Sequence, residues 1–182
     1  MKIYAIWEIQ HYVEVNGVYA EANVSSGWYP ENTLLTISLK KTVVECGNYT
    51  RRVFAAWTGS VNSNSPIVVI VVNKPIELVA TWRTQYWIEV HGIYSPVNFS
   101  PGWYDKGTTL KILLENEVVD FGNKTRAVFW KWSNGAEENP LQITVTRPLN
   151  ITALWRIEYW IEIKDPLKVL PIESSWYLKG SC

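Results

Sequence analysis

The amino-acid sequence repeats itself at an interval of about 75 residues, and this repeat constrains the fold more than any other feature. Gly27-Trp28-Tyr29 returns as Gly102-Trp103-Tyr104 and, in part, as Ser175-Trp176-Tyr177. A Thr-Arg pair followed by Phe and Trp also recurs, at residues 50–57 and 125–132. Agreement of this density along the whole chain predicts tandem copies of one small module.

The repeat divides the chain into two whole copies and two partial ones. Residues 10–83 and 84–156 are predicted to be complete repeats, residues 1–9 the closing strand of a preceding copy, and residues 157–182 the opening part of a truncated third. The sequence thus starts and stops within a repeat, so we expect it to be a segment of a longer protein. No Gly/Ser-rich or Pro-rich linker separates the copies, which predicts strand-continuous, semi-rigid junctions.

The hydrophobic pattern predicts β-strands. Between residues 76 and 90 the side chains alternate with a period of two, which is typical of a strand with one buried face. Shorter β-rich runs occupy residues 33–39, 53–57 and 66–72, and clusters of Gly, Asn, Ser and Pro between them indicate turns. No segment of twelve residues keeps a helical period. We predict an all-β fold of small antiparallel modules, each with about five or six strands, joined by continuous strands.

Composition and charge exclude several classes of protein. The chain is 47% hydrophobic and holds eleven Trp, which is ample material for a core. Lys+Arg and Asp+Glu are 17 each, so the basic excess typical of nucleic-acid binders is absent. The longest apolar run, residues 67–72, indicates a buried strand and falls far short of the roughly 20 residues of a membrane helix. We expect neither a nucleic-acid partner nor a membrane span in this segment.

The sequence contains no recognisable catalytic or metal-binding constellation. His11 and His91 do not occupy equivalent positions, and both are predicted to lie on strand surfaces. Glu14, Glu89 and Glu162 do recur. Acid chemistry is one interpretation, but a residue repeated on the polar side of a strand is typical of a register or solubility device. Phosphate-binding, calcium and zinc motifs are missing too, so we expect no enzyme and no cofactor.

The two cysteines, Cys46 and Cys182, do not form a disulfide framework or a zinc pattern. Cys46 aligns with Phe121 of the second repeat, which predicts a buried, inert thiol. A functional thiol is the alternative.

Five Asn-x-Ser/Thr sequons bear on the compartment. Four lie at predicted turns and one on the polar face of a strand, where a glycan would point into water; they are Asn23, Asn48, Asn98, Asn123 and Asn150. About two are expected by chance, and the alternative interpretation is that Asn and Thr serve only as turn residues. The residues after Met1 do not form a signal peptide. This leaves a cytosolic protein open, but we favour an extracellular or cell-surface glycoprotein whose leader lies outside this sequence.

The tryptophans are the sharpest candidates for a binding site. Trp28, Trp103 and Trp176 are predicted at turns, and Trp87 and Trp160 on the polar side of strands. Exposed aromatic rings can stack on sugar rings, so a carbohydrate-binding module is one interpretation. The favoured interpretation is that these rings seal small cores or the contacts between modules, where large rings bury the most area.

The order of the motifs resembles a known family. A strand, Gly-Trp-Tyr, Phe-x-x-Trp, a loop ending in Asn-Pro and a closing Ile-Thr-Ala-x-Trp follow one another at residues 102–104, 129–132, 139–140 and 151–155. This order resembles the divergent internalin-type B-repeat, or bacterial repeat domain, of cell-surface proteins, and the Trp-rich style is similar to versions in archaeal surface-layer and secreted proteins. The resemblance covers essentially the whole chain. It implies a β-grasp-like or small β-sandwich unit that serves as spacer, stalk or interaction module, without catalytic residues.

These observations lead to one expected function and one alternative. The expected function is a non-enzymatic extracellular structural segment, such as a stalk, spacer, filament or surface-layer component, N-glycosylated at its sequons. The alternative is an adhesin module that binds carbohydrate or protein through exposed Trp. The unpaired strand edges of the two partial repeats predict self-association, or association with other surface proteins, by β-edge pairing.

Overall fold

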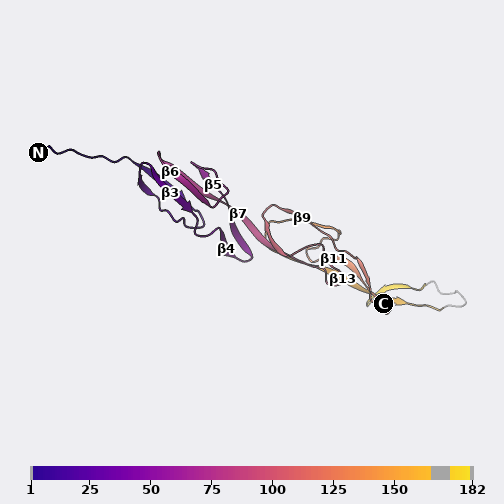
Figure 1. The fold of residues 1–182 in the computed structure, drawn as a ribbon. Coiled ribbons are helices and arrows are strands. Elements are labelled where there is room, and N and C mark those ends of the chain that lie inside the picture. The colour runs from indigo at the N-terminus through magenta and orange to yellow at the C-terminus, as the bar shows by residue number, and fades with distance from the viewer. Residues whose placement is uncertain (1, 165–172, 181–182) are drawn as a thin grey trace. The chain divides into compact units, whose positions relative to one another are not determined.

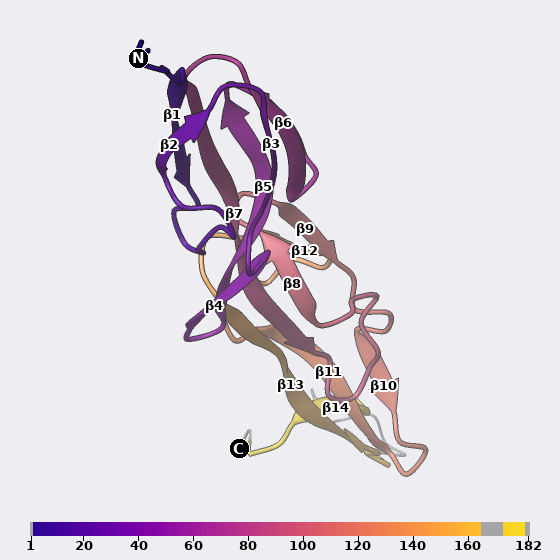
Figure 2. The ribbon, with the colours of Figure 1, turned by 60° about the vertical axis from the view of Figure 1, so that its left-hand side comes forward.

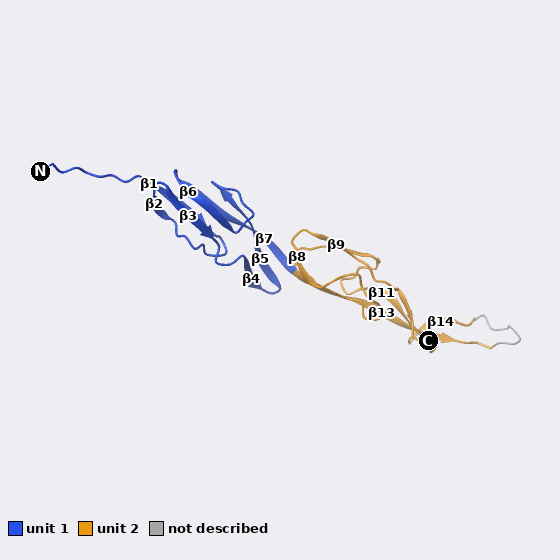
Figure 3. Ribbon diagram, in the orientation of Figure 1, with its two compact units in different colours: residues 1–86 blue, residues 87–182 orange. Residues whose placement is uncertain are grey.

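The protein, described here from a computed structural model, is all-β, which confirms the predicted fold class. The structure describes residues 2–164 and 173–180, and within these ranges it contains fourteen strands and no helix (Figure 1). The chain divides into two compact units, unit 1 at residues 1–86 and unit 2 at residues 87–182 (Figure 3). The point of division lies within one strand, β7 (Ile76–His91), so the closing strand of the first repeat continues as the first strand of the second.

Unit 1 consists of six strands and the first part of β7. The six are β1 (Gln10–Asn16), β2 (Gly27–Pro30), β3 (Thr33–Ser38), β4 (Val43–Gly47), β5 (Thr50–Gly59) and β6 (Ile67–Val72). Five strands form one sheet in the order β2-β1-β7-β5-β4, and β3 and β6 form a second sheet (Figure 2). The predicted five or six strands miss β2 and β4, because these edge strands are too short to show an alternating pattern.

The first and closing strands of unit 1 lie side by side and run parallel. Val13 of β1 is opposite Ile76 of β7, and Asn16 is opposite Val79. The other strand pairs of unit 1 are antiparallel, so the module is mixed rather than wholly antiparallel. A parallel partner needs a crossover of a dozen or more residues. Here the rest of the repeat serves as that connection, which a local pattern of side chains does not indicate.

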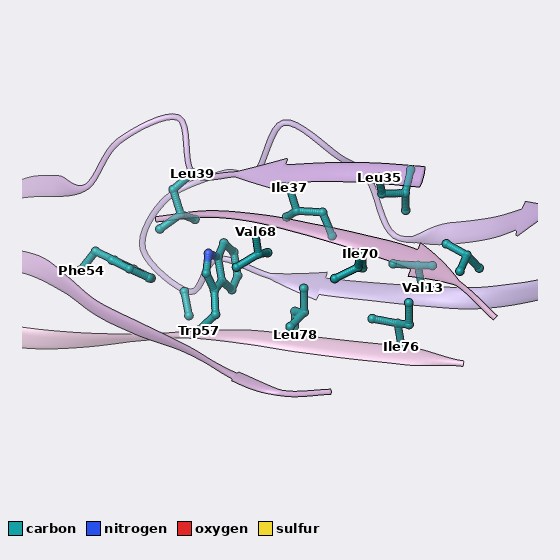
Figure 4. Close-up of a cluster of buried hydrophobic side chains, with 12 residues drawn as sticks. Val13, Leu35, Ile37, Leu39, Phe54, Trp57, Val68, Ile70, Ile76 and Leu78 are labelled. Carbon is teal, nitrogen blue, oxygen red and sulfur yellow. The ribbon is translucent and has the colours of Figure 1, made fainter. Parts of the chain in front are cut away.

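The core of unit 1 lies between its two sheets. Inward-facing side chains of β1, β5 and β7 meet those of β3 and β6 in one cluster (Figure 4). The cluster surrounds Trp57, which is 0% exposed and donates its indole N–H to the carbonyl oxygen of Pro66 at 3.2 Å. Residues 67–72 form the strand predicted there, but only alternate residues of β6 are buried. Its other face is exposed, because no further layer of the described chain covers the outer side of the two-stranded sheet.

A β-bulge explains the spacing of the Phe-x-x-Trp motif. Phe54 and Trp57 are three positions apart, which places them on opposite faces of a regular strand. The pairing of β5 with β7 shifts register between Phe54 and Ala56, so one extra residue is inserted. Both rings therefore face the core, with centroids 5.8 Å apart. The same register shift, between Phe129 and Lys131, recurs in unit 2.

Unit 2 has the same arrangement. It contains the last part of β7 together with β8 (Gly102–Asp105), β9 (Thr109–Ile112), β10 (Val118–Asp120), β11 (Thr125–Trp132), β12 (Leu141–Thr144), β13 (Leu149–Ile161) and β14 (Ser175–Leu178). β7 and β13 are parallel, with Ile88 opposite Leu149, and β9 and β12 form the small sheet. Trp132 occupies the place of Trp57 and is again 0% exposed. The period of the sequence is thus a period of the structure.

Residues 2–9 contain no strand, although a closing strand is predicted there. Ile3 is 84% exposed and Trp7 is 89% exposed. A closing strand pairs with the first strand and the fifth strand of its own repeat, as β7 pairs with β1 and β5. The described chain supplies no such partners for residues 2–9, so the alternating pattern is present but has nothing to pair with.

Cys46 does not have the predicted environment. Its side chain is exposed rather than buried. It lies on β4, an edge strand of which four of the five residues are exposed. Phe121, the equivalent residue of the second repeat, is exposed as well, so the alignment of the two positions holds while the inference of burial is wrong. Cys182 lies outside the described residues.

Candidate functional site

A tryptophan near the end of each repeat forms a hydrogen bond with the loop that follows the first strand of the same repeat. The indole N–H of Trp82 donates to the carbonyl oxygen of Gly17 at 2.9 Å, and that of Trp155 donates to Gly92 at 2.8 Å. We call Trp82 and Trp155 the closing tryptophans. Each also meets a tyrosine edge-on, Tyr19 or Tyr94, at centroid distances of 5.9 and 5.6 Å. The closing strand is therefore fastened to the loop that follows the first strand.

The loop that receives each closing tryptophan is a tight glycine turn. Tyr19 N–H donates to the oxygen of Gly17 at 2.8 Å, which is the spacing of a three-residue γ-turn. The central residue, Val18, has a φ of 62°, and its counterpart Ile93 has a φ of 68°. Branched side chains seldom adopt this region. The predicted sites do not include this turn, whose sequence signal is Gly-Val-Tyr from residue 17 and Gly-Ile-Tyr from residue 92.

Removing the indole donor alone is expected to weaken each module measurably. Trp82→Phe keeps an aromatic ring but loses the N–H that donates to Gly17. We expect unit 1 to lose about 1 kcal/mol of unfolding free energy, because a net intramolecular hydrogen bond contributes about that amount. Urea unfolding of the full chain measures it, with Trp155→Phe as the matched variant in unit 2. Identical unfolding of wild type and Trp82→Phe would show that this hydrogen bond contributes nothing.

Three aromatic pairs recur on the first two strands of the successive repeats. Each pair meets edge-on, with centroids 5.5, 5.7 and 5.6 Å apart; the pairs are Tyr12/Trp28, Trp87/Trp103 and Trp160/Trp176. Trp28, Trp103 and Trp176 lie in strands β2, β8 and β14, so their predicted place at turns is wrong. Cross-strand partners of β-forming residues stabilise these four-residue strands.

The three aromatic pairs differ in exposure. Trp28 is 67% exposed, whereas the tryptophans of the other two pairs are partly buried. The guanidinium of Arg126 lies over the ring of Trp176 with its Cζ 4.3 Å from the centroid. Arg126 is held there by Glu158, whose Oε2 accepts from Nε at 2.8 Å and lies 2.7 Å from Nη2. This is a cation–π contact backed by an ion pair.

One further aromatic contact is specific to the second repeat. Trp130 lies at the bulge of β11, where unit 1 has Ala55. Lys131 Nζ and Arg156 Cζ lie 4.1 and 4.5 Å from the centre of its ring. Two cations thus lie against the ring, although Trp130 remains 41% exposed.

All five sequon asparagines have exposed side chains. Two of them also bond to the backbone of the neighbouring small sheet. Asn23 donates from Nδ2 to Thr36 O at 2.9 Å and accepts from Ser38 N at 2.7 Å, and Asn98 accepts from Leu113 N at 2.5 Å. A glycosylated amide keeps one N–H, so both roles are compatible at Asn23.

The other three sequons stand on a turn, a loop and a strand. Asn48 and Tyr49 both have positive φ in the hairpin between β4 and β5, which is typical of a type I′ turn. Asn123 lies in the loop between β10 and β11, and Asn150 faces outward on β13.

The titratable residues that the sequence singles out are not brought together. Glu162 pairs with Lys124 at 3.1 Å, Glu89 lies 3.2 Å from His91, and Glu14 is exposed. The recurring glutamates therefore share a position but not a partner. Within residues 2–164 and 173–180 no three His, Cys, Asp or Glu residues are grouped as a metal site.

His11 differs from its predicted place on a strand surface. Its side chain is 19% exposed, and its Nε2 is buried without a hydrogen-bond partner, 3.5 Å from Glu31 Oε1. The other predicted surface histidine, His91, is exposed.

A surface depression of about 710 Å³ lies over the loop between β1 and β2. It is lined by residues 15–26 and by Lys40. Lys40 Nζ donates to Glu21 Oε2 at 2.6 Å, and this hydrogen bond together with the positive charge lowers the pKa of Glu21, against a small opposing effect of desolvation. Both side chains are well exposed, so the pair indicates a solvated surface rather than a catalytic acid.

The outer face of the small sheet differs between the two repeats. In unit 1 it presents Leu34, Val69 and Val71, all exposed. The register of β9 with β12 places Thr109, Gln142 and Thr144 at the equivalent positions of unit 2. Unit 1 thus carries an outer apolar face that its otherwise equivalent repeat lacks.

None of the protein-family profiles, curated proteins or solved structures compared with the chain matches it. Across the described residues, no helix has the length and apolar character needed to cross a membrane.

Proposed function

We propose that this chain is a load-bearing structural segment of an extracellular or cell-surface protein, built from divergent internalin-type B-repeats and glycosylated at its exposed sequons. The observation that carries this proposal is the parallel pairing of the first and closing strands within each repeat. Tension enters a module at the start of the first strand and leaves at the end of the closing strand. Because the two strands point the same way, such tension loads their hydrogen bonds in shear, all at once, instead of opening them one by one.

The recurring side chains support the same role. The closing tryptophans fasten the closing strand to the glycine turn. The bulged Phe-x-x-Trp motif brings two rings together in each unit, around a fully buried tryptophan. The residues that recur in both repeats are thus those that attach the closing strand and pack the aromatic rings.

Single-molecule stretching of the full chain by its ends tests the proposal. We expect two discrete unfolding events, one for each unit. Glu14→Pro is expected to lower the force of the unit 1 event, since Val15 N–H donates to Ser26 and the N–H of the adjacent Glu14 therefore faces β7. Glu14→Ala, which keeps that N–H, is the matched control, and unit 2 is an internal reference. Gradual extension without discrete events would contradict a load-bearing role.

The glycoprotein part of the proposal has its own test. Peptide mass spectrometry of protein from its native source is expected to find glycans on exposed sequons such as Asn48 and Asn150. Five unmodified sequons would remove the support for an extracellular compartment.

A second candidate function is an adhesin module that binds carbohydrate or protein. The exposed ring of Trp28 and the outer apolar face of unit 1 favour it. Titration of the chain with soluble glycans, compared with its Trp28→Ala variant, distinguishes the two functions. A fluorescence change that Trp28→Ala abolishes would support the adhesin, and no change with any glycan would reject its carbohydrate-binding form.

A further inference from the structure

The covered aromatic pair of unit 2 shows how one repeat meets the opening of the next. Trp160 and Trp176 belong to the third copy of the repeat, whereas Arg126 belongs to the second copy. Arg126 lies over Trp176 at 4.3 Å, and Thr125, on the same strand, is paired with Tyr159 of the third copy. An arginine of one module therefore covers the aromatic pair of the module that follows.

The Tyr12/Trp28 pair has the same edge-on geometry, but no arginine or lysine of the described residues lies over its rings. Its rings meet edge-on at 5.5 Å, and Trp28 is the most exposed tryptophan of the three pairs at 67%. Gln10 stands at the sequence position of Glu158 and of Gln85. Gln85 accepts a hydrogen bond from Arg51 Nε at 2.8 Å in unit 1, so a glutamine at this position can hold the arginine of the repeat.

The residues before Gln10 carry the apolar sequence pattern of a closing strand. Ile3 aligns with Leu78 and Ile151, which are 0% and 2% exposed, while Ile3 itself is 84% exposed. Trp7 aligns with the closing tryptophans and is 89% exposed. Apolar residues whose equivalents are buried or partly buried in the complete repeats thus directly precede the first strand of the uncovered aromatic pair in the sequence.

We propose that residues 2–10, with Tyr12 and Trp28, form an acceptor surface for the body of another module of this same kind, one whose β5-type arginine lies over Trp28 and bonds to Gln10. The inference rests on the proposed structural role in a repeat array. The occupant is the body of a β-module rather than a sugar, because an apolar stripe at a spacing of two continues from Ile3 to Trp7, and such a stripe matches a β-sandwich core.

An extended form of the full chain tests the inference. A second copy of residues 10–75 is placed before Met1, which keeps the register because residue 76 is equivalent to residue 1. The added copy carries Trp28→Phe, so that only the original Trp28 is read. Hydroxyl-radical footprinting with mass spectrometry then measures the oxidation of each tryptophan. We expect Trp7 oxidation to fall to the rate of Trp82, and Trp28 oxidation to fall to the rate of Trp176.

The arginine is tested by Arg51→Ala in the added copy alone. This variant is expected to restore Trp28 oxidation to the rate of the unextended chain while Trp7 stays protected. Unchanged Trp28 oxidation in the extended protein, or equal protection with and without the arginine, would overturn the inference. Protection of Trp28 by soluble glycans in the unextended chain would overturn it in favour of a sugar site.

A peptide version does not depend on folding of the added copy. The unextended chain is titrated with a synthetic peptide of residues 118–132 and with its Arg126→Ala form. Protection of Trp28 by the first peptide only supports the inference, and equal effects of the two overturn it. If neither the added copy nor the peptide protects Trp28, the acceptor surface is rejected. The stretching experiment is unaffected by that result, because it depends on the strand pairs within each unit.

Discussion

Trp57→Ala is expected to lower the unfolding free energy of unit 1 by about 3–5 kcal/mol, the range measured for removing a large buried aromatic side chain. Trp57 is 0% exposed, lies 5.8 Å from Phe54 between ring centroids, and donates to Pro66 O. The variant leaves both a cavity and an unsatisfied carbonyl. Small domains are stable by only about 5–15 kcal/mol, so unit 1 is expected to unfold at a much lower urea concentration.

Trp28→Ala is the matched control in the same unit. It removes the same kind of side chain from a site that is 67% exposed. Among the described residues its one ring contact is with Tyr12, and such a pair contributes about 1 kcal/mol. Trp132→Ala provides the equivalent core variant in unit 2. If Trp57→Ala costs no more than Trp28→Ala, the core described here is not the one that stabilises the module.

Gly17→Ala is expected to destabilise unit 1 by about 3 kcal/mol, at the upper end of the usual cost of overpacking. A Cβ at this position would lie 1.7 Å from the carbonyl oxygen of Ala20. That oxygen belongs to the backbone of the same tight turn and cannot move aside without breaking it. The turn also accepts the indole N–H of Trp82, so the substitution disturbs the fastening of the closing strand too.

Gly27→Ala is the control for this effect. A Cβ there would have its nearest neighbour at 4.0 Å, on the flexible ring of Tyr29. We expect a change within about 0.5 kcal/mol, as for most surface substitutions. Gly92→Ala is predicted to repeat the large effect in unit 2, where the added Cβ would lie 1.8 Å from Ser95 O. Equal urea midpoints for Gly17→Ala and Gly27→Ala would contradict the geometry of the glycine turn.

The longer strands and the core of each repeat are predictable from the sequence because both depend on local alternation, whereas the short edge strands are not. The pattern at residues 76–90 identifies the inward side chains of β7, among them Leu78 and Ile88. The repeat itself shows that the second copy must use the same positions. Packing residues such as Trp57 and Trp132 follow from this, since a repeated large apolar residue on a strand is best explained by burial.

Other features depend on contacts that alternation does not encode. The parallel pairing of β1 with β7 joins residues far apart in the chain. Two strands that each have one apolar face can pair in parallel or antiparallel orientation, so the alternation does not predict which one forms. The burial of Cys46 is predicted wrongly because an edge strand has no second layer, which depends on strand order. The glycine turn is a matter of backbone geometry at Gly17 and Val18, which a hydrophobic pattern does not describe.

A closing strand forms only when it pairs with the body of its own repeat. Hydrogen exchange of three equivalent segments in one molecule tests it most directly: residues 2–8, 77–83 and 150–156. At low protein concentration we predict that residues 2–8 exchange at the rate of an unstructured peptide, while the backbone amides of the other two segments are protected by their strand pairs. Exchange of residues 77–83 and 150–156 as fast as that of residues 2–8 would contradict the account.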